Sequence, residues 1–377
     1  MPIIDRYLIR NFAQALLIFF ITFAGLFIVI DGFANLEDFL DQGAQSGGLA
    51  PLVARYYGVR SLAIFDRTSG VLTLIAAMFT LTALERHNEL TALMAAGISR
   101  ARLAKPLIGA VIAVSVLAVA NRELLLPQFR EQLSTNAQDF GGERARSVRP
   151  QYDYQTDVFL NGRSAFLTEG RIEEPRFRLP LGLSQYGAQL AADEAVHLAA
   201  DGEHPQGFLL KNVTAPADVE SLPSLTLQDR PVLLMPSDTP WLGEHECFVA
   251  TDVELAQLAD SGAWRRFSST WDMIAALRNP STDFGPDVRV AVHARMVQPL
   301  LDITLLFLGL PLVLTRENRN IFVAIGMCLG VVLAFFVVVM AFHALGNNCL
   351  IRPATAAWAP LAVFVPLAVL MNDSLRS

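Results

Sequence analysis

The chain has 377 residues, of which 53% are hydrophobic and 17% are charged, and its formal net charge is −7. This balance argues against a set of soluble domains, and the apolar residues are also gathered in long runs. In the run 12–30, only Gln14 and Thr22 are polar. That length crosses a hydrocarbon layer about 30 Å thick and exceeds the apolar core of a secretory signal, about 7 to 15 residues. We therefore predict a membrane span that stays in the mature protein.

Five further apolar runs predict spans at 68–84, 106–120, 296–315, 321–345 and 354–371. The stretch 121–295 has no such run, is charged, and contains short segments of β type, so we place it outside the bilayer. The predicted fold class is a membrane α-helical protein with six transmembrane helices and an inserted all-β domain. The expected domains are 1–120, 121–295 and 296–377.

The charge of the short loops predicts the orientation. The loops 1–11, 85–105, 316–320 and 372–377 carry nine Lys and Arg residues, whereas 31–67 and 346–353 carry four beside five acids. The positive-inside rule then places both termini in the cytoplasm and 121–295 on the far side of the membrane. That outer region has sixteen basic and twenty-five acidic residues, a net charge of −9, which disfavours a nucleic-acid partner.

The outer region contains signals for short strands. Residues 156–168 read as two strands joined by Asn161-Gly162, the preferred sequence for a two-residue hairpin turn. Further strands are predicted at 207–213, 222–228, 232–235 and 247–253, which suggests a sandwich or jelly roll. A short helix is expected over 270–278, with Thr270 as a plausible N-cap and Pro280 beyond its end.

A metal or catalytic site is not expected in the outer region. In the segment GEHECF, 243–248, a strand would place His245 and Cys247 on one face, two ligands where zinc prefers four. No G-x-S-x-G or H-E-x-x-H motif is present, so we predict no catalytic residues. Three free thiols are favoured, although a bridge between Cys247 and Cys349 is conceivable.

A polar segment, LERHNELTALMAAGIS, separates the second and third predicted spans. As a helix, 85–96 places Leu90, Leu93, Met94 and, one turn on, Ile98 along one stripe. Gly97 fits a helix C-terminus and Ser99 fits the cap of the next helix. A solvated connector is the alternative, but a connector needs no apolar stripe, helix stop and restart. We therefore predict a helix that another protein contacts.

The chain has no visible means of hydrolysing ATP by itself. A phosphate-binding P-loop requires G-x-x-x-x-G-K-[ST], because its lysine must reach the β and γ phosphates. The sequence has two lysines, Lys105 followed by Pro106 and Lys211 followed by Asn212, and neither fits. We expect no cofactor, and any ATP hydrolysis must come from a separate subunit.

Several stretches resemble the LptF/LptG permease family, the membrane subunits of the lipopolysaccharide-export ABC transporter. LERHNELTALMAAGIS is similar to the coupling helix of that family, which contacts the ATPase. Other similar stretches are IIDRYLIRNF, IDGFANLEDFL, NRELLLPQF, VAVHARMVQPLLDITLLFLGLPL and AAWAPLAVFVPLAVL, in the same order as in the family. The resemblance covers nearly all the membrane part and is weaker through 141–265.

The resemblance implies a six-span, non-catalytic subunit of the inner membrane with a periplasmic jelly-roll domain. It also implies four partners: a second LptF/LptG-type permease, a cytosolic ABC ATPase dimer, a periplasmic bridge protein, and lipopolysaccharide or a related glycolipid. The coupling helix would be 85–98. By position Glu89 is its acidic residue that meets a basic group on the ATPase, with Glu85 and Arg86 as weaker candidates.

A glycolipid with phosphates and acyl chains requires an apolar wall and nearby cations. The first span supplies phenylalanines for the wall, and we predict lipid contacts at Phe20, Phe23 and Phe27. The family often has basic residues at the outer end of this span, where this sequence has acids, Asp31 among them. The available cations precede the second span: Arg55 and Arg60, together with Arg67. Their alternative role is that of ordinary interfacial anchors.

Two features of the later spans allow two interpretations each. Gly326 and Gly330 form a GxxxG motif, which allows two helices to pack closely. One interpretation is that it lies at the interface between two permeases. The other is that it has no special role, because glycine is frequent in membrane spans. Asp302 lies in the fourth span, where a carboxylate is a functional candidate by default. It lies about two turns from the outer end, at ~1.5 Å per residue, so we favour contact with water.

Two other classes of protein remain open. One is a mechanotransmitting ABC subunit or membrane scaffold that does not itself bind lipid. The other is a membrane-bound hydrolase, which the missing nucleophile and metal motifs disfavour. The sequence does not distinguish the F-like from the G-like half of the family. It also leaves open whether the chain pairs with an identical or a different permease.

Overall fold

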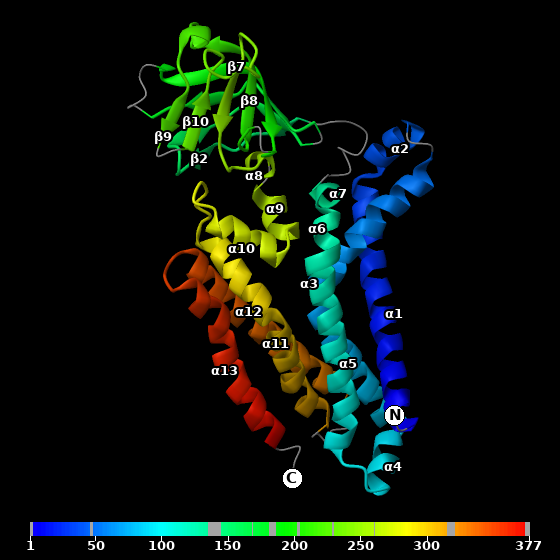
Figure 1. Ribbon diagram of the computed structural model, residues 1–377. Helices are drawn as coiled ribbons and strands as arrows, with labels where there is room; N and C mark the ends of the chain where they lie inside the picture. The colour runs from blue at the N-terminus through cyan, green and yellow to red at the C-terminus, as the bar shows by residue number, and fades with distance from the viewer. Residues whose placement is uncertain are drawn as a thin grey trace. The chain divides into compact units, whose positions relative to one another are not determined.

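The computed structural model describes residues 3–45, 48–134, 145–167, 169–180, 186–201, 204–227, 230–259, 261–314 and 321–373. The chain divides into two compact units. The helical unit comprises Met1–Gln132 and Gly285–Ser377, and the β unit comprises Leu133–Phe284 (Figure 1). The β unit is therefore an insertion in the chain of the helical unit.

The helical unit contains every helix that is long and apolar enough to cross a membrane among the described residues, six in all. Its elements are α1 (Ile3–Ala34), α2 (Leu36–Gln45), α3 (Leu49–Arg86), α4 (Glu89–Ala95), α5 (Arg100–Ala120), the π-helical turn η1 (Asn121–Leu125), α6 (Leu126–Gln128), α11 (Pro286–Leu314), α12 (Ile321–Asn347) and α13 (Pro353–Asp373). The six predicted spans are confirmed as α1, α3, α5, α11, α12 and α13. Helical structure continues past residue 120 through η1 and α6, and the short helix α7 (Arg130–Ser134) follows at the boundary with the β unit.

The stretch 31–67, expected to be a loop, is mostly helical over its described residues, 31–45 and 48–67. α1 continues to Ala34, α2 follows it, and α3 begins at Leu49, well before its apolar window. Hydropathy missed these turns because they are held by aromatic packing rather than by a continuous apolar run. Phe39 of α2 lies 5.1 Å from Tyr56 and 5.9 Å from Tyr57 of α3, measured between ring centroids, and all three side chains are buried.

One continuous core holds the helical unit together. α1 packs on α3 and α5, α11 packs on α3, α5, α12 and α13, and α12 packs on α13. Fully buried residues from different helices meet in this core, including Leu8, Leu81, Leu107 and Leu308. In a bilayer such contacts stabilise through close van der Waals packing, because lipid chains are as apolar as leucine.

The β unit is built on one antiparallel sheet of eleven strands. The strands are β1 (Arg146–Ser147), β2 (Gln151–Asp153), β3 (Val158–Leu160), β4 (Ser164–Phe166), β5 (Arg171–Glu173), β6 (Arg176–Arg178), β7 (Gln189–Leu198), β8 (Gly207–Ala215), β9 (Leu225–Leu227), β10 (Arg230–Leu234) and β11 (Cys247–Ala250). The main path runs β1-β4-β5-β7-β8-β11-β10-β9. Strands β5 and β6 both pair with β7, at different parts of its length. Buried side chains such as Phe177, Leu190 and Leu210 fill the interior.

The hairpin predicted around Asn161-Gly162 is wrong. β3 pairs with β2 and β6, whereas β4 pairs with β1 and β5. Neither Asn161 nor Gly162 has the positive φ that the predicted turn requires. Gly162 serves a different purpose, because a Cβ on it would collide with the side chain of Ile172. The glycine allows close approach of two segments rather than a tight reversal.

Three short helices end the β unit: α8 (Leu255–Ala259), α9 (Ser261–Phe267) and α10 (Thr270–Arg278). α10 covers the predicted helix, but its N-cap is Ser269 and not Thr270. The Ser269 hydroxyl accepts from the Asp272 amide, and the Asp272 carboxylate accepts from the Ser269 amide. This reciprocal capping box explains the shift of one residue, because Asp272 lies at its third helical position.

The contact between Gly70 and Asp302 generates a test of the helical packing. A Cβ on Gly70 would lie 2.9 Å from Cγ of Asp302, so Gly70→Ala must push α3 and α11 apart or move the carboxylate. We expect a loss of about 1–3 kcal/mol of stability, as for other overpacked interiors. The melting temperature of the purified protein in detergent measures it.

Gly109→Ala is the matched control, because nothing lies within 4 Å of a Cβ at that helical position. Its melting temperature should equal or slightly exceed that of the parent protein, since alanine favours helices. The double variant Gly70→Ala, Asp302→Ala should recover much of the loss. Equal melting temperatures for Gly70→Ala and Gly109→Ala would refute the described packing.

Candidate functional site

The connection between α3 and α5 contains a separate short helix, α4. It is shorter than the predicted helix, because α3 ends at Arg86 and Asn88 takes a left-handed conformation with φ 58°. At the other end Gly97 has φ 82°, and the amides of Gly97 and Ile98 donate to the carbonyls of Met94 and Leu93. This is a Schellman motif. Ser99 then caps α5 by accepting from the Arg102 amide, so the predicted stop and restart are confirmed.

One face of α4 is packed into the core of the helical unit. Leu90 is 7% exposed and belongs to the same cluster as Leu8, Leu84 and Leu103. Leu93 and Ile98 pack against this cluster, as the predicted stripe requires. Met94 differs from the prediction, because it is exposed. α4 is therefore anchored on α3 and in the core of the helical unit, while its other face remains accessible.

The three predicted coupling residues lie around this connection. Glu85 and Arg86 are exposed in the last turn of α3, and Glu89 is the first residue of α4. The Tyr7 hydroxyl of α1 donates to Glu89, at 3.2 Å from Oε1 and 3.0 Å from Oε2. Sequence reasoning missed Tyr7, because no local pattern connects residues 82 positions apart.

The predicted lipid-facing phenylalanines of α1 have different surroundings. The Phe20 ring meets Phe65 of α3 edge to face, with centroids 5.7 Å apart. Phe27 is half-buried, whereas Phe23 is 46% exposed. Phe23 is therefore the most open of the three, and Phe20 mainly fixes α1 on α3.

Two of the six spanning helices are much less buried by the rest of the protein than the other four. In α1 and α12, 11% of the residues of the most apolar stretch are buried, against 28–50% in the other four. Gly326 and Gly330 lie on α12, are exposed, and have nothing within 4 Å of a built Cβ. Leu333 and Val337 continue this apolar face. Among the residues that the structure describes, no atom of another helix lies close to this GxxxG motif, so its surface is accessible.

The predicted cations all lie on α3. Arg55 and Arg67 are exposed, whereas the Arg60 guanidinium lies 4.2 Å from the centre of the Tyr56 ring. A cation over an aromatic face is attracted to its quadrupole, so Arg60 helps to hold the first turns of α3.

An ion pair that the sequence did not reveal connects α3 to η1. Arg122 Nε lies 2.8 Å from Asp66 Oδ1, and each side chain is 15% exposed. Next to it the Asn121 amide donates to the Leu62 carbonyl at 2.9 Å. Charges in an apolar interior are stable only when they are paired and hydrogen-bonded. This pair therefore fixes the end of α5 against the middle of α3.

Asp302 faces neighbouring protein rather than only water. Its Oδ1 accepts from Gln298 Nε2 at 2.9 Å, one turn earlier on α11, and its carboxylate lies against Gly70 of α3. Gly70 makes room for the carboxylate, which a larger residue would displace. The carboxylate therefore contributes to the contact between α11 and α3.

Asp31 forms a hydrogen bond within the helical unit. It is one of the acidic residues at the end of α1, where the related family often has basic residues. The Tyr57 hydroxyl of α3 donates to Asp31 Oδ2 at 2.8 Å. Tyr57 is buried, so this bond ties the two helices together at that end. A cation at position 31 would lose this hydrogen bond.

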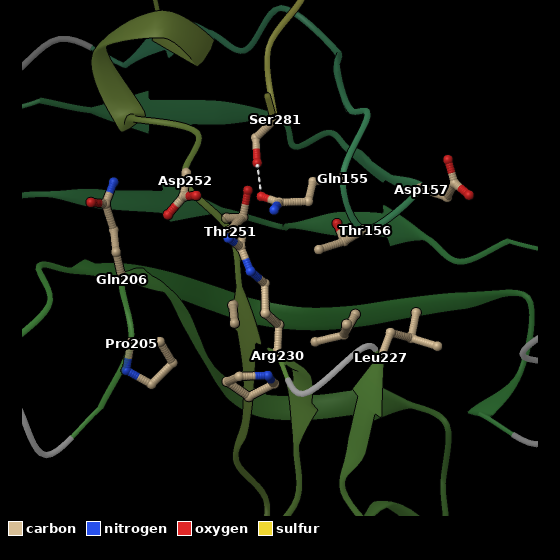
Figure 2. A pocket seen from close by; sticks show the side chains of 13 residues that line it. Gln155, Thr156, Asp157, Pro205, Gln206, Leu227, Arg230, Thr251, Asp252 and Ser281 are labelled. Atoms are coloured by element: carbon tan, nitrogen blue, oxygen red, sulfur yellow. Dashed lines mark hydrogen bonds between the residues drawn. The ribbon is translucent and has the colours of Figure 1, made fainter. Parts of the chain in front are cut away.

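The β unit contains a polar cavity of about 690 Å³ (Figure 2). Its wall includes Asp157, Asp252 and Arg230, two carboxylates and one guanidinium. Ser281 donates to Gln155 at 3.1 Å on one side. The volume is typical of small-molecule pockets, but the excess of carboxylates makes it a poor site for phosphate. Its residues come from five segments of the chain, which explains why no motif predicted it.

The segment GEHECF forms no continuous strand, because β11 begins only at Cys247. His245 is exposed and lies 3.0 Å from Glu220, whereas Cys247 is fully buried. Burial raises the pKa of the Cys247 thiol to about 12, so it stays protonated and is a poor metal ligand. Among the described residues no group of three or more His, Cys, Asp and Glu is placed to hold a metal. All three cysteines are free.

Comparison with protein families gives one match. The model of the lipopolysaccharide export system permease LptF/LptG matches residues 6–174 and 224–372. A comparison with curated proteins gave no match. The family match includes all six spanning helices and the α3–α5 connection, and it omits β6, β7 and β8. The chain therefore belongs to the LptF/LptG family of lipopolysaccharide export permeases.

Proposed function

We propose that the chain is a permease subunit that takes lipopolysaccharide, or a similar glycolipid, from the inner membrane and passes it to a periplasmic bridge protein. A cytosolic ABC ATPase dimer drives this movement, and a second permease of the family completes the passage. Family membership supports a role in lipopolysaccharide export. The particular partners and the direction of transfer are our inference.

The observation that carries the proposal is the geometry of α4. A short helix held by buried Leu90 presents Glu89, Glu85 and Arg86 at one end of the helical unit. The first residues of α1 and the end of α13 lie at the same end (Figure 1). The loops at this end are rich in Lys and Arg, which supports a cytoplasmic location for both termini and a periplasmic location for the β unit.

The passage for the lipid is proposed along α1 and α12. These two helices have the smallest share of buried residues among the six, and large apolar side chains such as Ile21, Phe23 and Val337 are exposed on them. A second permease placed against them would enclose an apolar space with Phe23 on its wall. Gly326 and Gly330 would allow that permease to approach α12 closely, and Arg55, Arg60 and Arg67 of α3 remain the proposed contacts of the lipid phosphates.

The alternative, a mechanotransmitting subunit or membrane scaffold, uses the same α4 contact with the ATPase. It differs only in whether lipid enters between the spans. The open apolar face of α1 favours the permease, because a scaffold requires no lipid-accessible phenylalanine.

Charge reversal at Glu89 tests the coupling. Glu89→Lys should reduce ATP-dependent lipopolysaccharide export at least about tenfold, equivalent to about 1.4 kcal/mol, because a lysine would repel a basic group on the ATPase. The ATPase itself should still hydrolyse ATP. Export from proteoliposomes and phosphate release are measured in the same samples.

Glu37→Lys is the control for this reversal. Glu37 is exposed on α2, at the end of the helical unit opposite α4. This variant makes the same change of charge and should export normally. Equal export by both variants would contradict the role of Glu89.

Photocrosslinking tests whether lipid enters between the spans. A photoreactive amino acid in place of Phe23 should form lipopolysaccharide adducts during ATP turnover, because this side chain is exposed on the proposed wall. Leu370 of α13 is also exposed and is the control for general contact with membrane lipid. Lipopolysaccharide adducts at Phe23 in excess of those at Leu370 support the permease, and equal yields would favour the scaffold.

A further inference from the structure

Two polar contacts connect the first turns of α1 to α4 and to the first turn of α5. The first is the hydrogen bond from Tyr7 to both oxygens of Glu89. The second is an ion pair between Asp5 and Arg102, with 3.1 Å between Oδ2 and Nη2. In addition, Leu8 of α1 and Leu90 of α4 are both buried in the core of the helical unit.

Beside Tyr7, three other residues give α1 a continuous, largely buried face. Asp5, Leu8 and Phe12 follow at intervals of three and four, so they lie along one side of the helix. Leu8 and Phe12 are 0% and 2% exposed. The first turns of α1 are therefore packed on α3 and α5, and the hydrogen bond from Tyr7 connects them to α4.

We propose that Tyr7 is a positioning residue for coupling: it holds Glu89 in the orientation that the ATPase meets, so that force on α4 passes directly into α1. This inference rests on the proposed function and adds a specific transmission path to it. Glu89, and not Tyr7, is the residue that contacts the ATPase. The group that it meets there is an arginine or lysine, because these side chains are complementary to a carboxylate.

The geometry explains why a phenol suits this position. A Glu side chain rotates freely when it is exposed, so presenting it in one orientation costs conformational entropy on binding. A hydroxyl that donates to both carboxylate oxygens restricts this rotation and leaves the negative charge intact. A lysine or arginine at position 7 would neutralise the carboxylate and compete with the ATPase. Tyrosine orients Glu89 without removing its charge.

The path into α1 follows from the stiffness of a helix. α1 contains 32 residues, which corresponds to roughly 48 Å at ~1.5 Å per residue. A displacement at Tyr7 therefore moves Phe23 as part of the same rod. Because α1 is one of the two least covered spans, this movement changes the surface that we propose meets the lipid.

Tyr7→Phe tests the proposal, because it removes only the hydroxyl and keeps the ring. We expect three- to tenfold more ATP hydrolysed per lipopolysaccharide exported, with an unchanged melting temperature. Tyr152→Phe is the matched control: its hydroxyl donates to Asp157 at 2.8 Å in the β unit, a similar phenol–carboxylate bond far along the chain. It should leave the ratio unchanged.

A double variant separates positioning from a direct role. In a Glu89→Gln background, Tyr7→Phe should add less than twofold to the ratio, because the hydroxyl acts through the carboxylate. Independent, multiplicative effects of the two changes would overturn the proposal. So would a Tyr7→Phe protein whose ratio matches that of Tyr152→Phe.

The ion pair between Asp5 and Arg102 allows a second, independent test of the path through α1. Asp5→Arg should uncouple export by repelling Arg102, and the exchange Asp5→Arg, Arg102→Asp should restore at least half of the coupling. Failure of the exchange together with a normal ratio for Tyr7→Phe would exclude α1 from the transmission path. If Glu89→Lys itself exports normally, the proposed function fails; if Glu89→Lys uncouples while Tyr7→Phe is normal, only the present inference fails.

Discussion

The packing of α4 on α3 and into the core of the helical unit is the contact on which the functional account depends. A polar connection of about a dozen residues would otherwise move independently of the spans and could not transmit force. Leu90 anchors it in the core, the Schellman motif at Gly97 ends the helix sharply, and Ser99 begins α5 at once. The carboxylate of Glu89 is thereby presented on a structure that moves with the membrane helices.

Charged groups inside the helical unit fix which helices move together. Asp66 and Arg122 are both largely withdrawn from solvent, so separating them would leave a buried charge without its partner. Such separation typically costs about 3–5 kcal/mol. The pair therefore joins α3 to η1, and the contact of Asp302 with Gly70 joins α11 to α3. By contrast, only 11% of the residues in the most apolar stretches of α1 and α12 are buried within the described part of the chain, which leaves much of those surfaces accessible.

The parts of the fold that depend on local chemistry were predictable from the sequence. Apolar runs predicted the six spans, and Gly97 and Ser99 predicted the stop and restart around α4. Contacts between distant residues were not predictable: Tyr7 meets Glu89 and Arg122 meets Asp66 only after the helices pack. The hairpin at Asn161-Gly162 failed for the same reason, since Gly162 is required by the close approach of Ile172 and not by a turn. The helical content of 31–67 was missed because buried Phe39, Tyr56 and Tyr57 stabilise it through packing.

The central claim is that this chain moves lipid with energy supplied by another subunit. Its most direct test is the transfer of lipopolysaccharide from proteoliposomes that contain this chain and its partner permease, with and without the separate ATPase. The account predicts ATP-dependent transfer only when the ATPase is present, and no nucleotide hydrolysis by the permeases alone. ATP hydrolysis by the purified chain, or equal transfer without the ATPase, would contradict it.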